Sequence, residues 1–568
     1  MNRPVTRLAA RLVATAVAAA VAVVVAAPLL GASPAGAASH ALVNGSGSSW
    51  AENAVNQWVA DVNANGIQVV YNPDGDAQGR QDFANKVSDF SVTSDGYQGV
   101  DPVTGVADTS HGRPYVYLPI AAGGTSFPYQ IKIDGQQVEN LRLSGETLAK
   151  IFTNQITNWD DSAITKDNNG VALPSLPIIP VVQSEGSGAT QQLTSYFASQ
   201  YPTIWRSFAG QAGPTEYFPR QGDQIAQNGS NGAMNYVASS SANGSISYVE
   251  YSFALSVNYP VVKVLNSAGY FTLPTQYNVA VALEAAQINM DPSSPDYLLQ
   301  NLTDVYTDTD PRTYPLSSYV YMIEPTGTSG TDASETTAKR QSIADFSYYS
   351  ICQGQKEIGP IGYSPLPVNL VEAGFGQIAK LQQADPGVDL TSENIDTCNN
   401  PTFVLGQPNS NYLAQIAPLP PACDMIGAGP CAAGVTPNGI GATPTSSGTY
   451  PGSAAGAGGS SGSAGGSGGG SSSAAAGGGG PGGHGTTAAG AASGSAGAAA
   501  TASGGAAAGS AGTSATTLPT YDPTTLGGIN LVARLSTLWW AALLLLAAFG
   551  VPVVIGYRRA RLRNRGAS

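Results

Sequence analysis

The sequence predicts an α/β protein of two lobes. Both ends of its 568 residues have a strongly biased composition. The middle part, roughly 400 residues, has an ordinary share of large apolar side chains and is long enough for two separate cores. Patterns typical of strand, loop and helix alternate along it. Such alternation favours parallel sheets covered by helices.

Consecutive strand, loop and helix segments open the middle part. In order they are a strand with a Gly/Ser loop at 42–50, a helix at 51–63, a strand at 67–71, a polar loop at 72–79, a helix at 80–86 and a strand at 88–95. The first helix is predicted from apolar residues that recur at helical spacing. In parallel sheets the ligand crevice lies at the carboxyl ends of the strands. The loops that follow these strands are therefore candidates for a binding site.

A short loop near the middle of the chain, Gln183–Thr190, is the strongest candidate for a ligand site. It joins an apolar run at 178–182, interpreted as a buried strand, to the opening of a helix near Gln191. A Gly-Ser-Gly loop before a helix gathers unpaired backbone N–H groups at the positive end of the helix dipole, which attracts anions. An ordinary strand-to-helix turn with Ser187 as N-cap explains the same residues.

Further elements indicate a second lobe. Residues 115–120 are interpreted as the crossover into it, Ser144 as the N-cap of a helix at 143–152, and 230–237 as a helix before a strand at 245–249. The expected organisation is a signal peptide at 1–38, lobe I at 41–118 and 251–400, lobe II at 119–250, a Cys- and Pro-rich extension at 401–442, a linker at 443–517, a transmembrane helix at 535–557 and a basic tail at 558–568.

The two ends predict that the middle part lies outside the cytoplasm. Arginines, the apolar run 13–27 and the small residues at 35–37 are typical of a secretory signal peptide. Residues 443–517 are almost wholly Gly, Ala and Ser, and we expect a flexible coil there. The apolar segment 535–557 is long enough to span a bilayer, and the arginines of 558–568 indicate a cytoplasmic tail.

The four cysteines agree with an oxidising compartment. Of the three possible pairings we favour Cys352 with Cys398 and Cys423 with Cys431. No pair has CxxC spacing and no His lies nearby, so we expect no metal site. The Gly-rich loops fit neither a dinucleotide fingerprint nor a P-loop, so we expect no cofactor.

Charge and histidine content narrow the function classes. The chain has 24 Lys and Arg against 37 Asp and Glu. Nucleic acid is not an expected partner, because phosphate backbones require clustered positive charge. The histidines, His40, His111 and His484, lie where none could activate a serine. We therefore expect a binding protein and not an enzyme.

A series of short motifs occurs in order between Ala41 and about Leu381. They are GSGSSW at 45–50, DF at 89–90, SD at 94–95, LSGETLAKIFTNQITNWDD at 143–161, EGSG at 185–188, ISYVEY at 246–251, FTLPT at 271–275 and GYSPLP at 362–367. In this order the segment resembles the PstS family, the phosphate-binding subunits of phosphate-specific ABC importers. The resemblance implies a two-lobed periplasmic-binding-protein fold of class II (Venus flytrap) that closes over dehydrated phosphate. It also implies that permease subunits of an importer are partners.

The resemblance assigns ligand-binding roles to several loop residues. Ser49 and Trp50 fall on the hydroxyl and amide donors of the first loop. Asp95 falls on the acid that accepts a phosphate proton and so excludes sulfate. The positions of the fourth loop are Gln183, Ser187, Gly188 and Ala189.

Two loops depart from the family pattern. This chain has Asp76 where the family has a hydroxyl, and Gln183 where the family has an arginine. Both changes weaken the binding of a dianion unless another cation compensates. Arg80 is the nearest candidate in sequence, although pairing with Asp76 or Asp82 is the simpler interpretation of it.

Two functions therefore fit the sequence. One is a membrane-tethered solute-binding protein for inorganic phosphate or a similar small oxyanion that feeds an ABC importer. The other is a surface-tethered domain of the same fold that has lost tight phosphate binding and acts as a sensor, an adhesin or a binder of another polar ligand. The deciding observation is whether the loop tips around Ser49, Asp76, Asp95 and Ser187 converge on one cavity between the lobes, with a guanidinium pointing into it. If the tips are scattered, or if the protein's own side chains fill their shared space, the transport interpretation fails and only a tethered scaffold is left.

Overall fold

The computed structural model describes residues 40–428 apart from 101–104, 106, 405 and 408–409. These residues belong to the first of two compact units, Met1–Ala454. The predicted signal peptide, linker, transmembrane helix and basic tail lie outside the described residues, as does Cys431. Among the described helices, none combines the length and apolar character needed to cross a bilayer.

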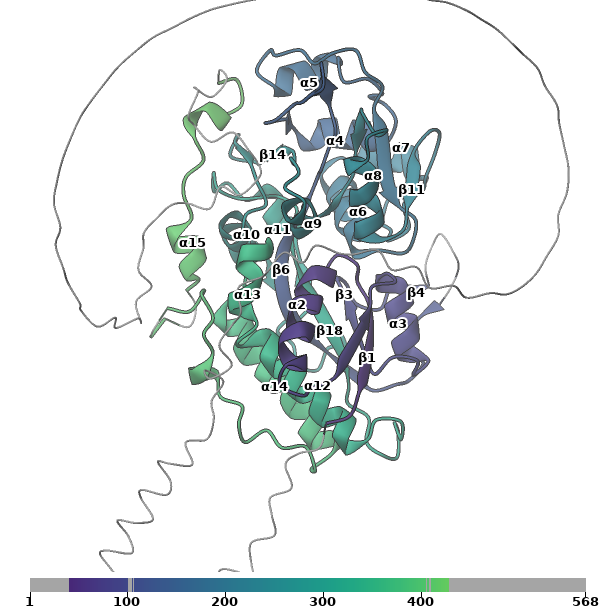
Figure 1. Ribbon diagram of the computed structural model, residues 1–568, viewed down its shortest axis with the longest axis vertical. Coiled ribbons are helices and arrows are strands. Elements are labelled where there is room, and N and C mark those ends of the chain that lie inside the picture. Colours follow the sequence, from purple (N-terminus) through teal and green to yellow (C-terminus); the bar gives the residue numbers. More distant parts are fainter. Residues whose placement is uncertain (1–39, 101–104, 106, 405, 408–409, 429–568) are drawn as a thin grey trace, which may run out of the picture. The chain divides into compact units, whose positions relative to one another are not determined.

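The largest sheet in the described part of the chain is mixed and has six strands in the order β13-β6-β18-β3-β1-β2 (Figure 1). It combines strands from the beginning of the described chain with strands from later parts. Its strands are β1 (Val43–Gly47), β2 (Val69–Asn72), β3 (Phe90–Thr93), β6 (Tyr115–Ser126), β13 (Val249–Glu250) and β18 (Ser317–Pro325). β2, β1 and β3 run parallel, which confirms the arrangement predicted for the first strands. β18 runs antiparallel to β3 and β6, and β13 antiparallel to β6, so the complete sheet is mixed.

Helices cover this sheet and complete what we call the first lobe. They are α2 (Glu52–Asn63), α3 (Asp76–Ala84), α9 (Tyr251–Ser256), α10 (Gln276–Ala282), α12 (Thr337–Ile351), α13 (Gln355–Ile361) and α14 (Val368–Ala384). α2 buries Ala54, Val55, Trp58 and Val62, the helical spacing predicted from the sequence. Figure 1 shows α12 and α14 side by side, and both contact β6.

The start of α3 differs from the prediction. The segment 72–79 was expected to be a loop and the helix to begin near Arg80, but α3 begins at Asp76. The reason is local. Gly75 has a φ of 107°, which turns the chain sharply into the helix, and an acid in the first helical turn is favoured by the helix dipole.

The central part of the described chain forms what we call the second lobe. It contains two three-stranded sheets, in the orders β11-β10-β12 and β15-β14-β9. Their strands are β9 (Arg142–Leu143), β10 (Ile179–Gln183), β11 (Ile225–Gln227), β12 (Ser245–Ile246), β14 (Lys263–Leu265) and β15 (Phe271–Thr272), and the helices are α4 (Gly145–Phe152), α5 (Ser162–Asp167), α6 (Gly188–Gln200), α7 (Pro202–Ala209) and α8 (Gly229–Ala238). The predicted lobe boundaries stay predictions, and β14 and β15, which fall within the predicted first lobe, join the sheet of β9 in the second.

The predicted cap at Ser144 is confirmed, as is the cap at Ser187 that was the alternative to a ligand loop, and one predicted strand is corrected. Ser144 caps α4 and Ser187 caps α6, each accepting a hydrogen bond from the backbone N–H three residues on. The strand expected at 245–249 is instead two short strands. β12 pairs with β10 in the second lobe, whereas β13 pairs with β6 in the first, because the chain changes sheets between them.

The remaining elements are short and lie outside the main sheets. They are β4 (Gly99–Val100), β5 (Ala107–Asp108), β7 (Lys132–Ile133), β8 (Gln136–Gln137), β16 (Gln287–Ile288), β17 (Gln300–Asn301), α11 (Thr303–Thr307) and α15 (Tyr412–Ile416), with 3-10 turns at Leu283–Ala285, Ile395–Thr397 and Ala422–Asp424. The predicted disulfide between Cys352 and Cys398 is confirmed. The predicted pair of Cys423 with Cys431 involves a residue outside the described chain and stays a prediction.

Candidate functional site

The predicted loop tips meet where the two lobes touch. Ser49 follows β1, Asp76 opens α3, Asp95 follows β3 and Ser187 precedes α6. Backbone contact joins the lobes here, since Ala77 N donates a hydrogen bond to the carbonyl of Gly186 at 3.1 Å. The tips therefore converge on one site.

The carboxylate of Asp76 lies at the centre of these contacts. Its Oδ1 accepts a hydrogen bond from Ser94 N at 2.7 Å, and its Oδ2 accepts one from Gly188 N at 2.8 Å. Ser94 belongs to the first lobe and Gly188 opens α6 in the second, so one side chain bridges both. The Asp76 side chain thus fills the space between the two amides, which is the arrangement expected to count against transport. Asp76 is only 1 % exposed. This burial raises the pKa of Asp76, although the amides of Gly188 and Ser94 and the Arg80 guanidinium act in the opposite direction.

The amino end of α6 approaches the first lobe very closely. A side-chain carbon placed on Gly188 would lie 2.0 Å from Ser94 Oγ and 2.6 Å from Asp76 Oδ1. Only glycine fits this contact. The Ser94 hydroxyl is buried and has no hydrogen-bond partner among the described residues. Ala189 is fully buried and packs into the main hydrophobic core.

The first loop makes a second contact between the lobes. Ser49 Oγ accepts a hydrogen bond from Ser230 N at 3.2 Å and lies 3.3 Å from Ser230 Oγ. Ser230 stands in the first turn of α8 and was not among the predicted site residues; its Ser-Asn-Gly start of a helix was the available signal. Trp50 is buried, and its indole N–H donates to Thr125 Oγ1 at 3.1 Å. Its side chain therefore serves the core of the first lobe.

Gln183 brings no positive charge to the site. Its side-chain nitrogen lies 3.4 Å from both Ser230 Oγ and the Tyr248 carbonyl. Its Oε1 is buried without a partner among the described residues. The side chain is 2 % exposed, so it presents a neutral amide to the contact between the lobes.

Arg80 is paired, but not with the predicted acids. Its Nε donates to Asp108 at 2.8 Å, and one terminal nitrogen donates to both oxygens of Glu216 at 2.7 and 2.9 Å. The expected pairing with Asp76 or Asp82 is therefore wrong. The reason is burial: Arg80 is 0 % exposed and points from the covered face of α3, where acids distant in sequence meet it.

Asp95 lies close to Asp76, Arg80 and Glu216, and its carboxyl group has a raised pKa. Burial, together with the negative charge of Asp76, raises the pKa of Asp95 to about 7, while Arg80 lowers it. Its Oδ2 is buried and has no partner among the described residues. At neutral pH this carboxyl therefore exists as a mixture of acid and base, which suits a group that exchanges a proton with a ligand.

The charges of the site sum to a negative value. The carboxyl groups are those of Asp76, Asp95, Asp108 and Glu216, and Arg80 is the guanidinium that faces them. The pKa of Glu216 is raised chiefly by burial, against the effect of Arg80. Glu216 was not predicted, because it lies in an irregular segment after α7 that carries no sequence signal.

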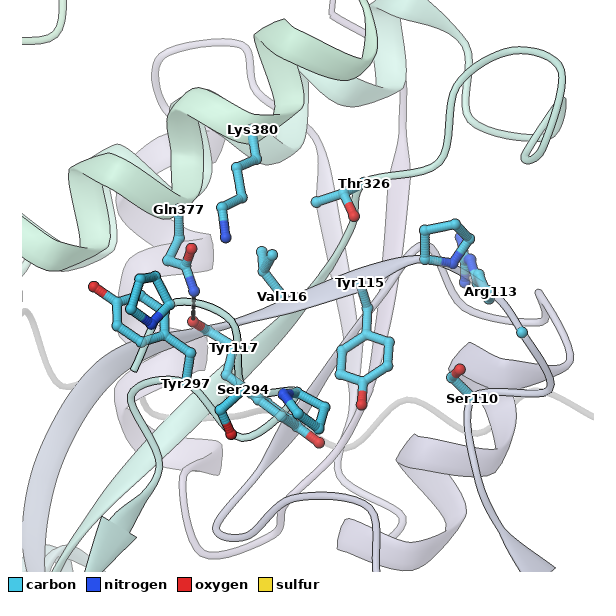
Figure 2. Close-up of a pocket in the computed structure, with 14 residues that line it drawn as sticks. Ser110, Arg113, Tyr115, Val116, Tyr117, Ser294, Tyr297, Thr326, Gln377 and Lys380 are labelled. Carbon is cyan, nitrogen blue, oxygen red and sulfur yellow. Dashed lines mark hydrogen bonds between the residues drawn. The ribbon is translucent and has the colours of Figure 1, made fainter. Parts of the chain in front are cut away.

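A separate cavity of about 380 Å³ lies elsewhere in the first lobe. Figure 2 shows Lys380 and Gln377 of α14 above Tyr115 and Tyr117 of β6. None of the predicted site residues lines this cavity, and its guanidinium, that of Arg113, is paired with Asp332 and Glu335. The contact between the lobes is therefore the candidate site.

Two lobes whose loop tips meet around a buried, negatively charged group define a substrate-binding protein of the clamshell type. The profile of the PBP superfamily domain matches residues 32–353, more than half of the chain. The chain belongs to this superfamily, whose members include the curated PstS relatives that share this region.

Curated relatives share this region. "Phosphate-binding protein PstS" of Xylella fastidiosa is 29% identical over 331 residues, which cover 58% of this chain and 83% of the relative. "Phosphate-binding protein PstS 2" of Mycobacterium tuberculosis is 28% identical over 335 residues, covering 57% and 83%.

Solved structures with a similar fold include PfluDING, described as a high affinity periplasmic phosphate-binding protein bound with phosphate. It has a TM-score of 0.46 and 17% identity, covering 61% of this chain and 99% of its own. An ancestral soluble variant of the Human Phosphate Binding Protein has a TM-score of 0.46 and 19% identity, covering 63% and 98%.

Proposed function

We propose that this protein binds inorganic phosphate, or a similar small oxyanion, outside the cytoplasm and delivers it to an ABC importer. The family supports the proposal, since the relatives carry the name phosphate-binding protein. Ser49, Asp95, Ser187 and Gly188 are the proposed ligand contacts that this chain retains. Gln183 presents a neutral amide to the site, and Asp76 and Arg80 set its charge, whereas the side chains of Trp50 and Ala189 pack into the core.

One observation carries the proposal. The amides of Ser94 and Gly188, from opposite lobes, both donate to a single carboxylate. Two oxygens of phosphate accept hydrogen bonds from such amides as a carboxylate does, and the amino end of α6 favours negative charge. The buried hydroxyl of Ser94 lies beside the same position and supplies a donor for a further oxygen.

Calorimetry on the full-length protein in detergent tests the proposal. We expect heat of binding with phosphate at concentrations up to the millimolar range and much weaker binding of sulfate, because Asp95 accepts a proton that sulfate lacks. Gly188→Ala is expected to abolish binding, since the added carbon would collide with Ser94 Oγ. Absence of heat with millimolar phosphate in the folded wild-type protein would contradict the proposal.

We further propose how the protein is held in place. Residues 1–38 direct secretion, 535–557 span the membrane, and 443–517 form the tether between the membrane and the binding lobes. A tether of this kind raises the effective concentration of the binding lobes near an importer in the same membrane. A chain that ends at residue 534 is expected in the medium, whereas the full chain is expected in the membrane fraction. Retention of the shortened chain by membranes would contradict this arrangement.

A second candidate function is a tethered domain that has lost tight phosphate binding and serves as a sensor, an adhesin or a binder of another polar ligand. Two observations favour it: the Asp76 carboxylate fills the position between the amides, and Gln183 is neutral. The same calorimetry separates the two candidates, because this one predicts no heat with millimolar phosphate.

A further inference from the structure

Asp76 has an unusual set of hydrogen bonds for an acid in the first turn of a helix. Such an acid ordinarily interacts with the free amides of its own helix. Here both carboxylate oxygens accept instead from distant groups, Ser94 N at 2.7 Å and Gly188 N at 2.8 Å. The Asp76 side chain therefore links α3 to the end of β3 in its own lobe and to α6 in the other lobe.

The same two amides are the donors that the proposed function assigns to the ligand. α6 has 13 residues, and Gly188 is the first of them. The unpartnered, buried hydroxyl of Ser94 faces this point as well. A carboxylate supplies two oxygens to this set of donors, whereas a tetrahedral oxyanion supplies four. The site thus contains more donor capacity than Asp76 uses.

We propose that Asp76 is a tethered anion that competes with phosphate for the Ser94 and Gly188 amides and holds the lobes together until phosphate displaces it. The inference rests on the proposed function, because it assumes that phosphate takes the same donors. It explains why an acid stands where the family has a hydroxyl. The measured phosphate affinity then depends on how much more strongly phosphate binds these amides than the Asp76 carboxylate does, and not on the amides alone.

Displacement is feasible because the carboxylate is costly where it lies. Asp76 is buried, and burial raises its pKa. Asp95 and Glu216 add negative charge nearby, which destabilises an ionised Asp76 further. Once α3 moves away from α6, the Asp76 carboxylate can be hydrated while phosphate replaces it at the amides.

The test compares phosphate binding by full-length wild type, Asp76→Ser, Asp76→Asn and Asp74→Ser, using calorimetry in detergent at one pH and ionic strength. Asp74→Ser is the matched control: it removes the same charge two residues earlier, and the Asp74 carboxylate accepts from Asn72 and not from the amides of the site. We expect Asp76→Ser to lower the Kd at least tenfold and Asp76→Asn to lower it less, because the amide still occupies the space. Asp74→Ser should stay within about twofold of wild type.

A scattering measurement gives a second readout that does not depend on affinity. Without phosphate, Asp76→Ser should have a larger radius of gyration than wild type, because the link from α3 to α6 is lost, and added phosphate should restore compactness. The inference is overturned if wild type binds phosphate and Asp76→Ser binds it no more tightly. If neither protein binds, although circular dichroism shows both folded, the proposed function fails together with it.

Discussion

Two buried arginines, Arg80 and Arg113, are paired by similar chemistry and differ in what their partners connect. Arg113 donates to Asp332 at 2.6 Å, to Glu335 at 2.7 Å and to the carbonyls of Phe83 and Ser88. Every one of these partners belongs to the first lobe. Arg80 also lies between two acids, Asp108 and Glu216, but Glu216 comes from the second lobe.

The difference separates a structural ion pair from one that depends on closure. The Arg113 cluster stays desolvated whatever the second lobe does, because its acids, Asp332 and Glu335, are buried within one lobe. The contact of Arg80 with Glu216 exists only while the lobes touch. The energetic cost of losing each arginine should therefore differ, and so should its effect on binding.

The largest expected effect is that of Arg113→Met. The substitution leaves Asp332 and Glu335 buried without their guanidinium, and breaking such a pair costs about 3–5 kcal/mol. Urea denaturation of the full-length protein should show this loss. Phosphate affinity measured on the folded fraction should not change, since Arg113 lies away from the loop tips. A loss below about 1 kcal/mol would mean that the acids find other partners.

The surplus of acids beside Arg80 predicts a pH dependence of stability. The pKa of Asp95 in the folded protein is about 7, above the ordinary value near 4. The folded state then holds a proton that the unfolded chain releases, so this stabilisation is present below about pH 4 and is lost as the pH rises to 7. In the wild type the free energy of unfolding should decrease between pH 4 and pH 7. In Asp95→Asn this decrease should be smaller by about 2–4 kcal/mol.

Urea denaturation across that range provides the measurement for Asp95→Asn. Asp134→Asn is a suitable control, because Asp134 is an exposed acid at a surface turn. A wild-type profile that is unchanged by Asp95→Asn would show that the Asp95 carboxyl titrates normally.

Arg80→Met should cost less stability than the matched change at Arg113, about 1–3 kcal/mol. Asp108 keeps a hydrogen bond from Gln98 N at 2.9 Å, and Glu216 can reach water when the lobes separate. Phosphate affinity should fall, because a positive charge near the site is lost. Equal losses of stability for the two arginine variants would remove the distinction between the clusters, and an unchanged affinity would exclude Arg80 from the site.

Glu216→Gln should have the smallest effect on stability, within about 1 kcal/mol, because the amide oxygen still accepts from Arg80. Its expected consequence is a larger radius of gyration without phosphate, as the ion pair between the lobes is weakened. Glu335→Gln makes the matched change in the Arg113 cluster and should leave the radius unchanged. If both variants expand equally, the ion pair of Glu216 with Arg80 is not what holds the lobes together.

Local patterns allowed the sequence to predict much of the framework. The parallel strands β2, β1 and β3, the cap residues Ser144 and Ser187, and the pairing of Cys352 with Cys398 follow from spacing and composition. The strands and caps depend on residues near one another in the chain, and the four cysteines allow only three sets of disulfide pairs. The order of the family motifs also placed the loop tips at one site.

What only the tertiary structure decided is how the charged side chains share that site. Arg80 and Glu216 are 136 residues apart, and no periodicity marks Glu216 as its partner. The sequence shows that Asp76 is an acid where the family has a hydroxyl. Its hydrogen bonds from Ser94 N and Gly188 N, however, depend on how the lobes close. Side-chain pairing across two lobes is set by their contact geometry, which single-chain patterns do not encode.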